Sequence, residues 1–140
     1  VKWVDKDEIF KQADIISLHL PLTKKTKNLI TEVDLMSMKK DAIVINTSRG
    51  GIINEKDLYN VMQTGRLSGA GIDVYEKEPY SGPLKEIERC LMTSHIGSMS
   101  IDCRTKMEIE ATEEAIRFLK GELLQREVPK EEYDIQREGL

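Results

Sequence analysis

Three side chains with complementary chemistry, Arg49, Glu78 and His95, follow three separate apolar runs of this chain. An arginine can bind an anion, a histidine can give or take a proton near neutral pH, and a carboxylate can orient the histidine. If the three runs are parallel strands, their carboxyl ends meet at one edge of a sheet. We therefore expect the three side chains to come together there as a site for an anionic substrate.

The chemistry that suits these residue types is the reduction of a 2-oxo acid. A guanidinium can grip the planar carboxylate and the ketone through two parallel hydrogen bonds, which lysine cannot do as rigidly. Hydride addition to the ketone then requires a proton, which His95 could supply and, in the opposite direction, take back. The ordinary alternatives are a surface arginine in a strand-to-helix loop and a histidine that only packs at a strand end. Glu76 is the rival carboxylate to Glu78.

The composition narrows the class of protein. Charged residues make up 33% and hydrophobic residues 39% of the 140 residues, and the net charge is −4. Without a basic patch or interleaved aromatic residues, we expect no nucleic-acid partner. No apolar run approaches the roughly 20 residues of a membrane span, and no signal peptide is visible, so we expect no membrane partner and a cytoplasmic location. Cys90 and Cys103 follow no metal-binding spacing, and no metal site is predicted.

Helical and strand patterns alternate along the chain. We expect strands over 14–20, 41–46, 70–74 and 91–93, helices over 6–12 and 31–38, a helix from Asn54 to Gly65, and a long helix from Ser98 or Ser100 to about Gly121. The strand over 14–20 is rich in Ile and Leu, as is typical of a strand that is covered on both faces. The alternation predicts an α/β fold with a parallel sheet and right-handed crossovers.

Several motifs in order give the chain a resemblance to a known family. Residues 13–23 read ADIISLHLPLT, Glu78 precedes Pro79, and His95 lies in Ser-His-Ile-Gly. These segments resemble the NAD-binding domain of the D-isomer-specific 2-hydroxyacid dehydrogenases, which include D-lactate, phosphoglycerate and glyoxylate/hydroxypyruvate enzymes. The resemblance runs from about residue 7 to about residue 120. Two positions depart from the family's pattern. Ser94 stands where the family usually has proline, and Ser98 stands where many members have glycine.

The resemblance implies a role for each motif residue. Arg49 would bind and polarise the substrate, His95 would be the acid/base, and Glu78 would orient His95. Asp73 would face the nicotinamide, although a helix or loop cap is its ordinary alternative. His19 and Pro21 would line the adenosine side, and His19 is better explained as a strand-end packing residue than as a catalyst. The implied cofactor is NAD, with NADP not excluded, and the residues implied to contact it are Thr47, Ser48, Arg49, Asp73, His95, Gly97, Ser98, His19 and Pro21.

The family's Gly-rich phosphate loop has no counterpart in this chain. Gly69-Ala70-Gly71 begins such a pattern, but Val74 occupies the third glycine position and the segment leads into a strand. We therefore expect residues 1–121 to form the second half of a Rossmann-like doubly wound domain with a long C-terminal helix. Residues 122–140 would be a charged, partly mobile tail.

As implied by the resemblance, the whole enzyme would transfer hydride reversibly between NAD(H) and a D-2-hydroxy acid, and the chain alone would be inactive. The open edge of the strand over 14–20 favours a homo-oligomer, such as a dimer. Two alternatives stay open: a dinucleotide-sensing module of the corepressor kind, and a catalytically inactive interaction half-domain. Turnover of a 2-oxo acid by the whole protein would separate the enzyme from both.

Overall fold

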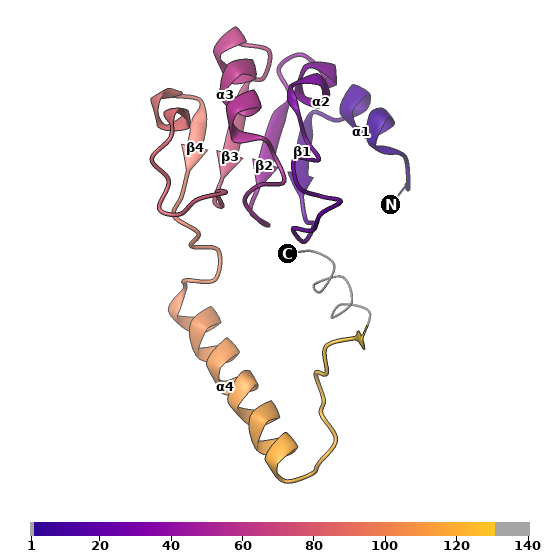
Figure 1. The fold of residues 1–140 in the computed structure, drawn as a ribbon, viewed down its shortest axis with the longest axis vertical. Helices are drawn as coiled ribbons and strands as arrows, with labels where there is room; N and C mark the ends of the chain where they lie inside the picture. The colour runs from indigo at the N-terminus through magenta and orange to yellow at the C-terminus, as the bar shows by residue number, and fades with distance from the viewer. Residues whose placement is uncertain (1, 131–140) are drawn as a thin grey trace. The chain divides into compact units, whose positions relative to one another are not determined.

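The structure is a computed structural model that describes residues 2–130 and divides into two compact units, Val1–His95 and Ile96–Leu140. The first unit contains one parallel sheet with the strand order β1-β2-β3-β4 (Figure 1). Its strands are β1 (Ile15–Leu18), β2 (Ile43–Asn46), β3 (Gly69–Ile72) and β4 (Cys90–Met92). Its helices are α1 (Lys6–Gln12), α2 (Glu32–Ser37), α3 (Glu55–Thr64) and the short 3-10 helix η1 (Pro83–Glu86), and the second unit contains α4 (Ile101–Leu119). The predicted parallel α/β sheet and the C-terminal helix are confirmed.

The helices of the first unit begin where polar side chains can cap their free N–H groups. Asp5 accepts a hydrogen bond from the N–H of Glu8, and Asn54 accepts one from the N–H of Asp57. Thr31 and Asp34 form a reciprocal capping box at the start of α2. The prediction missed η1, because its four residues are too few to show helical periodicity.

The core lies between the sheet and the helices, which pack along one face of it (Figure 1). Strand register places Ile16, Val44, Ala70 and Cys90 in one row across the four strands, and all four are buried. Helix α3 contributes Leu58, Val61 and Met62 to the same core, as its apolar spacing predicts.

The expectation that β1 is covered on both faces is wrong within this unit. Its residues alternate between exposed and buried, and Ile15 is 60% exposed while Ile16 is 5% exposed. The strand order increases in one direction, so right-handed crossovers place α2 and α3 on the same side of the sheet. The other face of β1 therefore remains open among the described residues.

The second unit consists of α4 and the segment that follows it. Ser100 caps α4 by accepting from the N–H of Cys103, which selects Ser100 over Ser98, and Gly121 follows the helix in a left-handed conformation. Part of the predicted tail contacts α4, because the carboxylate of Glu114 accepts from the backbone N–H of Gln125. Residues 131–140 lie outside the described residues, and the predicted mobility of the tail stays a prediction. No helix within 2–130 is long and apolar enough to cross a membrane.

Candidate active site

The loops that follow β2, β3 and β4 carry the three predicted side chains to one open hollow of about 560 Å³. Arg49, Glu78 and His95 all line it, together with Lys27 and Tyr75. The hollow lies at the carboxyl ends of the strands, where open parallel sheets bind their ligands.

Glu78 and His95 are in direct contact. One carboxylate oxygen of Glu78, Oε2, lies 3.0 Å from Nδ1 of His95, and the other, Oε1, accepts a 3.1 Å hydrogen bond from the backbone N–H of Tyr75. The two contacts fix the carboxylate on both sides, so it can hold the imidazole ring in one orientation. The rival carboxylate, Glu76, instead forms an exposed ion pair with Lys27 at 3.6 Å.

The same contacts favour the charged form of Glu78. The hydrogen bond from the Tyr75 N–H, followed by the one from His95, holds the pKa of the Glu78 carboxyl below its ordinary value. The carboxylate is therefore ionised at neutral pH and can stabilise a protonated imidazole.

The backbone of His95 is constrained as well as its side chain. Its φ angle of 54° is left-handed, which costs a residue with a side chain roughly 1–3 kcal/mol. The His95 N–H donates a 2.8 Å hydrogen bond to the carbonyl of Asp73, which links the ends of β3 and β4. Such a conformation persists only where its surroundings enforce it, and here it directs the imidazole toward Glu78.

A buried amide shapes the loop that carries Arg49. Asn46, which is 2% exposed, donates from Nδ2 to the Arg49 carbonyl at 2.9 Å. Its Oδ1 accepts from the Ser48 N–H at 3.1 Å and from the Ser48 hydroxyl at 2.9 Å. The Arg49 guanidinium donates a hydrogen bond to the Ser48 carbonyl. Within residues 2–130 no carboxylate forms an ion pair with the guanidinium, so Arg49 can bind an anion in the hollow.

The Arg49 loop and the Glu78 loop touch at Gly50. A Cβ atom on Gly50 would lie 1.9 Å from the carbonyl oxygen of Tyr75, a distance that no side chain could tolerate. Glycine is thus required for the two loops to approach each other.

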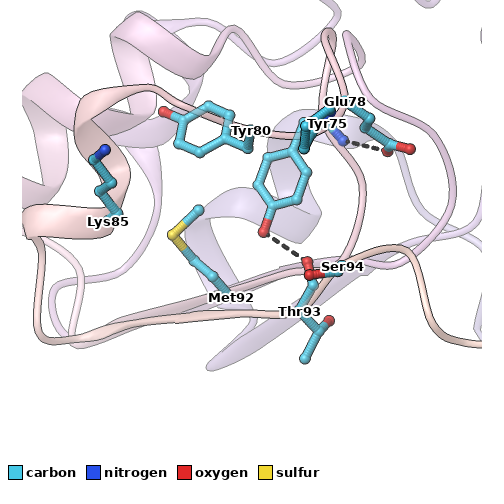
Figure 2. Close-up of a pocket in the computed structure, with 8 residues that line it drawn as sticks. Tyr75, Glu78, Tyr80, Lys85, Met92, Thr93 and Ser94 are labelled. Atoms are coloured by element: carbon cyan, nitrogen blue, oxygen red, sulfur yellow. Dashed lines mark hydrogen bonds between the residues drawn. The ribbon is translucent and has the colours of Figure 1, made fainter.

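The hydroxyl of Tyr75 contacts the chain at the ends of both β3 and β4. Its hydroxyl lies 2.9 Å from the carbonyl oxygens of Ile72 and Thr93, and Figure 2 shows its ring between the Thr93 carbonyl and the Glu78 loop. Burial is the main cause that raises the pKa of Tyr75 to about 12, so the hydroxyl stays protonated and can donate. The ring stacks on Tyr80 with centroids 4.6 Å apart.

The other residues that were predicted to contact a cofactor do not gather in one place. The Asp73 carboxylate is buried and accepts from the Thr93 hydroxyl, and it does not line the hollow. Thr47 is exposed and Ser48 half-buried after β2, whereas His19 and Pro21 follow β1, where the His19 ring lies 2.9 Å from the Ser17 hydroxyl. Gly97 and Ser98 belong to the second unit. Cofactor contact stays a prediction for all of them.

Sequence reasoning assigned no role to Asn46 or Tyr75, which shape the loops of the site. Asn46 had a usable signal, since an amide that ends a buried strand must find hydrogen-bond partners nearby. Tyr75 gave none, because both of its partners are backbone carbonyls, and one of them, at Thr93, lies 18 residues away. Within residues 2–130 no group of three or more His, Cys, Asp or Glu side chains could hold a metal ion.

Comparisons with known proteins agree with this geometry. The sequence model of the D-isomer specific 2-hydroxyacid dehydrogenase NAD binding domain matches residues 1–97. A glyoxylate reductase from Thermococcus litoralis is 40% identical over 123 residues, which cover 87% of this chain and 37% of that protein.

Solved structures give the same result. A glyoxylate reductase from Paecilomyes thermophila matches with a TM-score of 0.86 and 36% identity, over 93% of this chain and 40% of that one. D-lactate dehydrogenase with NAD+ from Lactobacillus jensenii matches with a TM-score of 0.81 and 27% identity, over 91% of this chain and 43% of that one. The chain thus spans about 40% of the length of these three relatives.

The contact at Gly50 predicts a difference between two glycine substitutions. Gly50→Ala should destabilise the chain by about 1–3 kcal/mol, because the added methyl group collides with backbone that must move. Gly71→Ala is the matched control, since its Cβ would lie 3.7 Å from Ile45 Cγ1, an ordinary contact. Urea unfolding of the two variants measures the difference, and equal stabilities would show that the loops do not depend on this approach.

The lowered pKa of Glu78 predicts its titration. The Glu78 carboxyl should protonate below pH 4.5, so its contribution to stability is fully present above that pH and is lost as pH falls through the folded-state pKa. In His95→Ala the midpoint should rise, because one of the two hydrogen bonds that lower the pKa of Glu78 is lost while the one from the Tyr75 N–H remains. Carbon-13 NMR of the carboxyl group measures both midpoints, and a value at or above 4.5 in the unsubstituted chain would contradict the described contacts.

Proposed function

The chain belongs to the family of D-isomer-specific 2-hydroxyacid dehydrogenases, and we propose that it is the part of such an enzyme that carries the catalytic side chains. The whole enzyme would transfer hydride between NAD(H) and a D-2-hydroxy acid or the corresponding 2-oxo acid. The observation that carries the proposal is the Glu78–His95 pair at 3.0 Å in the same hollow as Arg49.

Each of the three side chains has a distinct task in this reaction. The Arg49 guanidinium binds the substrate carboxylate and polarises the adjacent ketone. His95, with Nδ1 held by Glu78, exchanges the proton at the substrate oxygen through Nε2. Glu78 orients the ring and stabilises its protonated form, so it acts on the substrate only through His95.

The residues present fit the nicotinamide side of a dinucleotide site. Bound NAD would supply the hydride chemistry, which no protein side chain provides. Thr47 and Ser48 follow β2 at the rim where a ligand of a parallel sheet binds, and a buried carboxylate, Asp73, lies behind it. A Gly-rich turn for the pyrophosphate is not in this chain, so we expect the 140 residues alone to be inactive and to bind NADH weakly.

We also infer a cytoplasmic location for the protein and self-association of the 140-residue chain. Among the described strands β1 pairs with β2 alone, so its other edge offers unpaired backbone groups beside the exposed Ile15. Such an edge favours pairing with a second chain. The expected partners are therefore a small 2-oxo or 2-hydroxy acid and another copy of the protein.

The role of Arg49 is tested by Arg49→Lys in a whole dehydrogenase that contains this chain. We expect kcat/KM for 2-oxo acids to fall by about 10²-fold or more, because a point charge replaces the two-pronged guanidinium. NADH affinity, measured in parallel by calorimetry, should change little. Normal turnover of every accepted acid would show that Arg49 is structural, and an unsubstituted protein that turns over none of them would favour a binding module instead.

The positioning of His95 by Glu78 predicts a loss of turnover when the carboxylate is removed. Glu78→Gln keeps the size of the side chain but removes the charged partner of Nδ1, so kcat for 2-oxo acids should fall by about tenfold or more. Glu76→Gln is the control for the rival carboxylate and should leave kcat unchanged. Steady-state rates of the two variants measure the difference, and full activity in Glu78→Gln would exclude Glu78 from the catalytic set.

A further inference from the structure

Glu55, in the first turn of α3, contacts the loop between β3 and β4. Its Oε1 accepts a 2.6 Å hydrogen bond from the backbone N–H of Glu76, 21 residues along the chain. The side chain is half-buried, and burial is the main cause that raises the pKa of its carboxyl, while the hydrogen bond from Glu76 opposes the rise. The contact is therefore a short hydrogen bond from a backbone N–H to a carboxylate, and such charge-assisted bonds are stronger than those between neutral groups.

The peptide that Glu55 holds is also the meeting point of the two catalytic loops. Gly50 packs so closely on the peptide between Tyr75 and Glu76 that an added Cβ would lie 2.6 Å from the Glu76 nitrogen. Gly50 is the residue directly after Arg49. The position of this one peptide thus sets the separation between the Arg49 loop and the Glu78 loop.

From this peptide the contacts continue to the acid/base. The N–H of Tyr75 donates to Oε1 of Glu78 at 3.1 Å, and Oε2 of Glu78 lies 3.0 Å from Nδ1 of His95. The Tyr75 N–H belongs to the adjoining Val74–Tyr75 peptide, which shares the Cα atom of Tyr75 with the peptide that Glu55 holds. A shift of the Tyr75–Glu76 peptide that displaced Tyr75 would therefore also move the carboxylate that orients the imidazole.

We propose that Glu55 is a positioning residue that fixes the Tyr75–Glu76 peptide against Gly50, and so sets where Glu78 holds His95 relative to Arg49. The predicted effect of Glu55 on turnover rests on the proposed dehydrogenase function. Its predicted effect on the conformation of the loop does not depend on that function. The other side-chain contact at Glu76, the ion pair with Lys27, is more than half exposed on both sides and contributes little. Because a misplacement of about 1 Å can cost about 10²-fold in rate, a contact of this kind bears on catalysis without touching substrate.

Two substitutions separate the hydrogen bond from the charge. Glu55→Gln keeps a side-chain oxygen that can accept from the Glu76 N–H, whereas Glu55→Ala removes the acceptor. Both lose the negative charge that favours the start of a helix, so the difference between them reports the hydrogen bond. Lys56→Ala, at the next and exposed position of the same helix, is the control for changes in helix propensity.

The first measurement uses the 140-residue chain and needs no activity. Amide exchange of Glu76 should accelerate by about tenfold or more in Glu55→Ala and stay near the unsubstituted rate in Glu55→Gln and Lys56→Ala. The nitrogen-15 signals of the His95 ring should shift in Glu55→Ala alone. Exchange at the buried Leu58 amide of α3 is the internal reference for an intact fold. Unchanged Glu76 exchange or an unchanged His95 ring in Glu55→Ala would overturn the proposal, as would a Gln variant as disturbed as the Ala variant.

The second measurement uses the whole dehydrogenase. Glu55→Ala should lower kcat for 2-oxo acids by about tenfold, leave NADH affinity unchanged and be rescued by Glu55→Gln. If Glu55→Ala accelerated amide exchange at Glu76 but left kcat normal, the positioning role would be overturned. If the unsubstituted enzyme turned over no 2-oxo acid, the proposed function would fail, while the exchange and ring signals of the 140-residue chain would still decide the role of Glu55.

Discussion

The close approach of Gly50 to the Tyr75 carbonyl is the contact on which the geometry of the site depends. Two loops that follow neighbouring strands need not touch, because parallel strands fix only where each loop begins. Here the backbone of one loop rests directly on the backbone of the other, with no room for a side chain between them. Backbone contacts vary less than contacts between flexible side chains, so this contact, rather than the sheet, fixes how closely the Arg49 loop and the Glu78 loop approach each other.

Buried polar groups do most of the local shaping. Asn46 is almost fully buried, and its amide satisfies three groups of the loop that carries Arg49. The Tyr75 hydroxyl lies within hydrogen-bond distance of the carbonyl groups of Ile72, at the end of β3, and Thr93, just after β4, which share its single proton. A buried polar atom without a partner costs about 1–3 kcal/mol, so each of these side chains disfavours other loop conformations. Together these two side chains hold the loops of the site in a single conformation.

The Glu78–His95 pair has a different physical character. Its side chains are 39% and 47% exposed, so solvent screens their attraction and the pair adds little to the stability of the fold. What the structure supplies is orientation, through the Tyr75 N–H on one side of the carboxylate and the left-handed backbone of His95 on the other. An exposed pair held in this way can exchange protons with a ligand, which a fully buried pair could do only with difficulty.

The sequence by itself determined the order and type of the main elements, the helix caps at Asp5, Thr31 and Asn54, and the loops in which Arg49, Glu78 and His95 lie. These features depend on local patterns of apolar spacing, capping and turn residues, which neighbouring positions reveal. Only the tertiary structure decided which face of β1 is open, and that Glu55 and Gly50 meet one peptide of the Glu78 loop. The two contacts at this peptide join residues that are far apart in the sequence, and a backbone N–H or carbonyl carries no residue-specific signal by which its partner could be recognised beforehand.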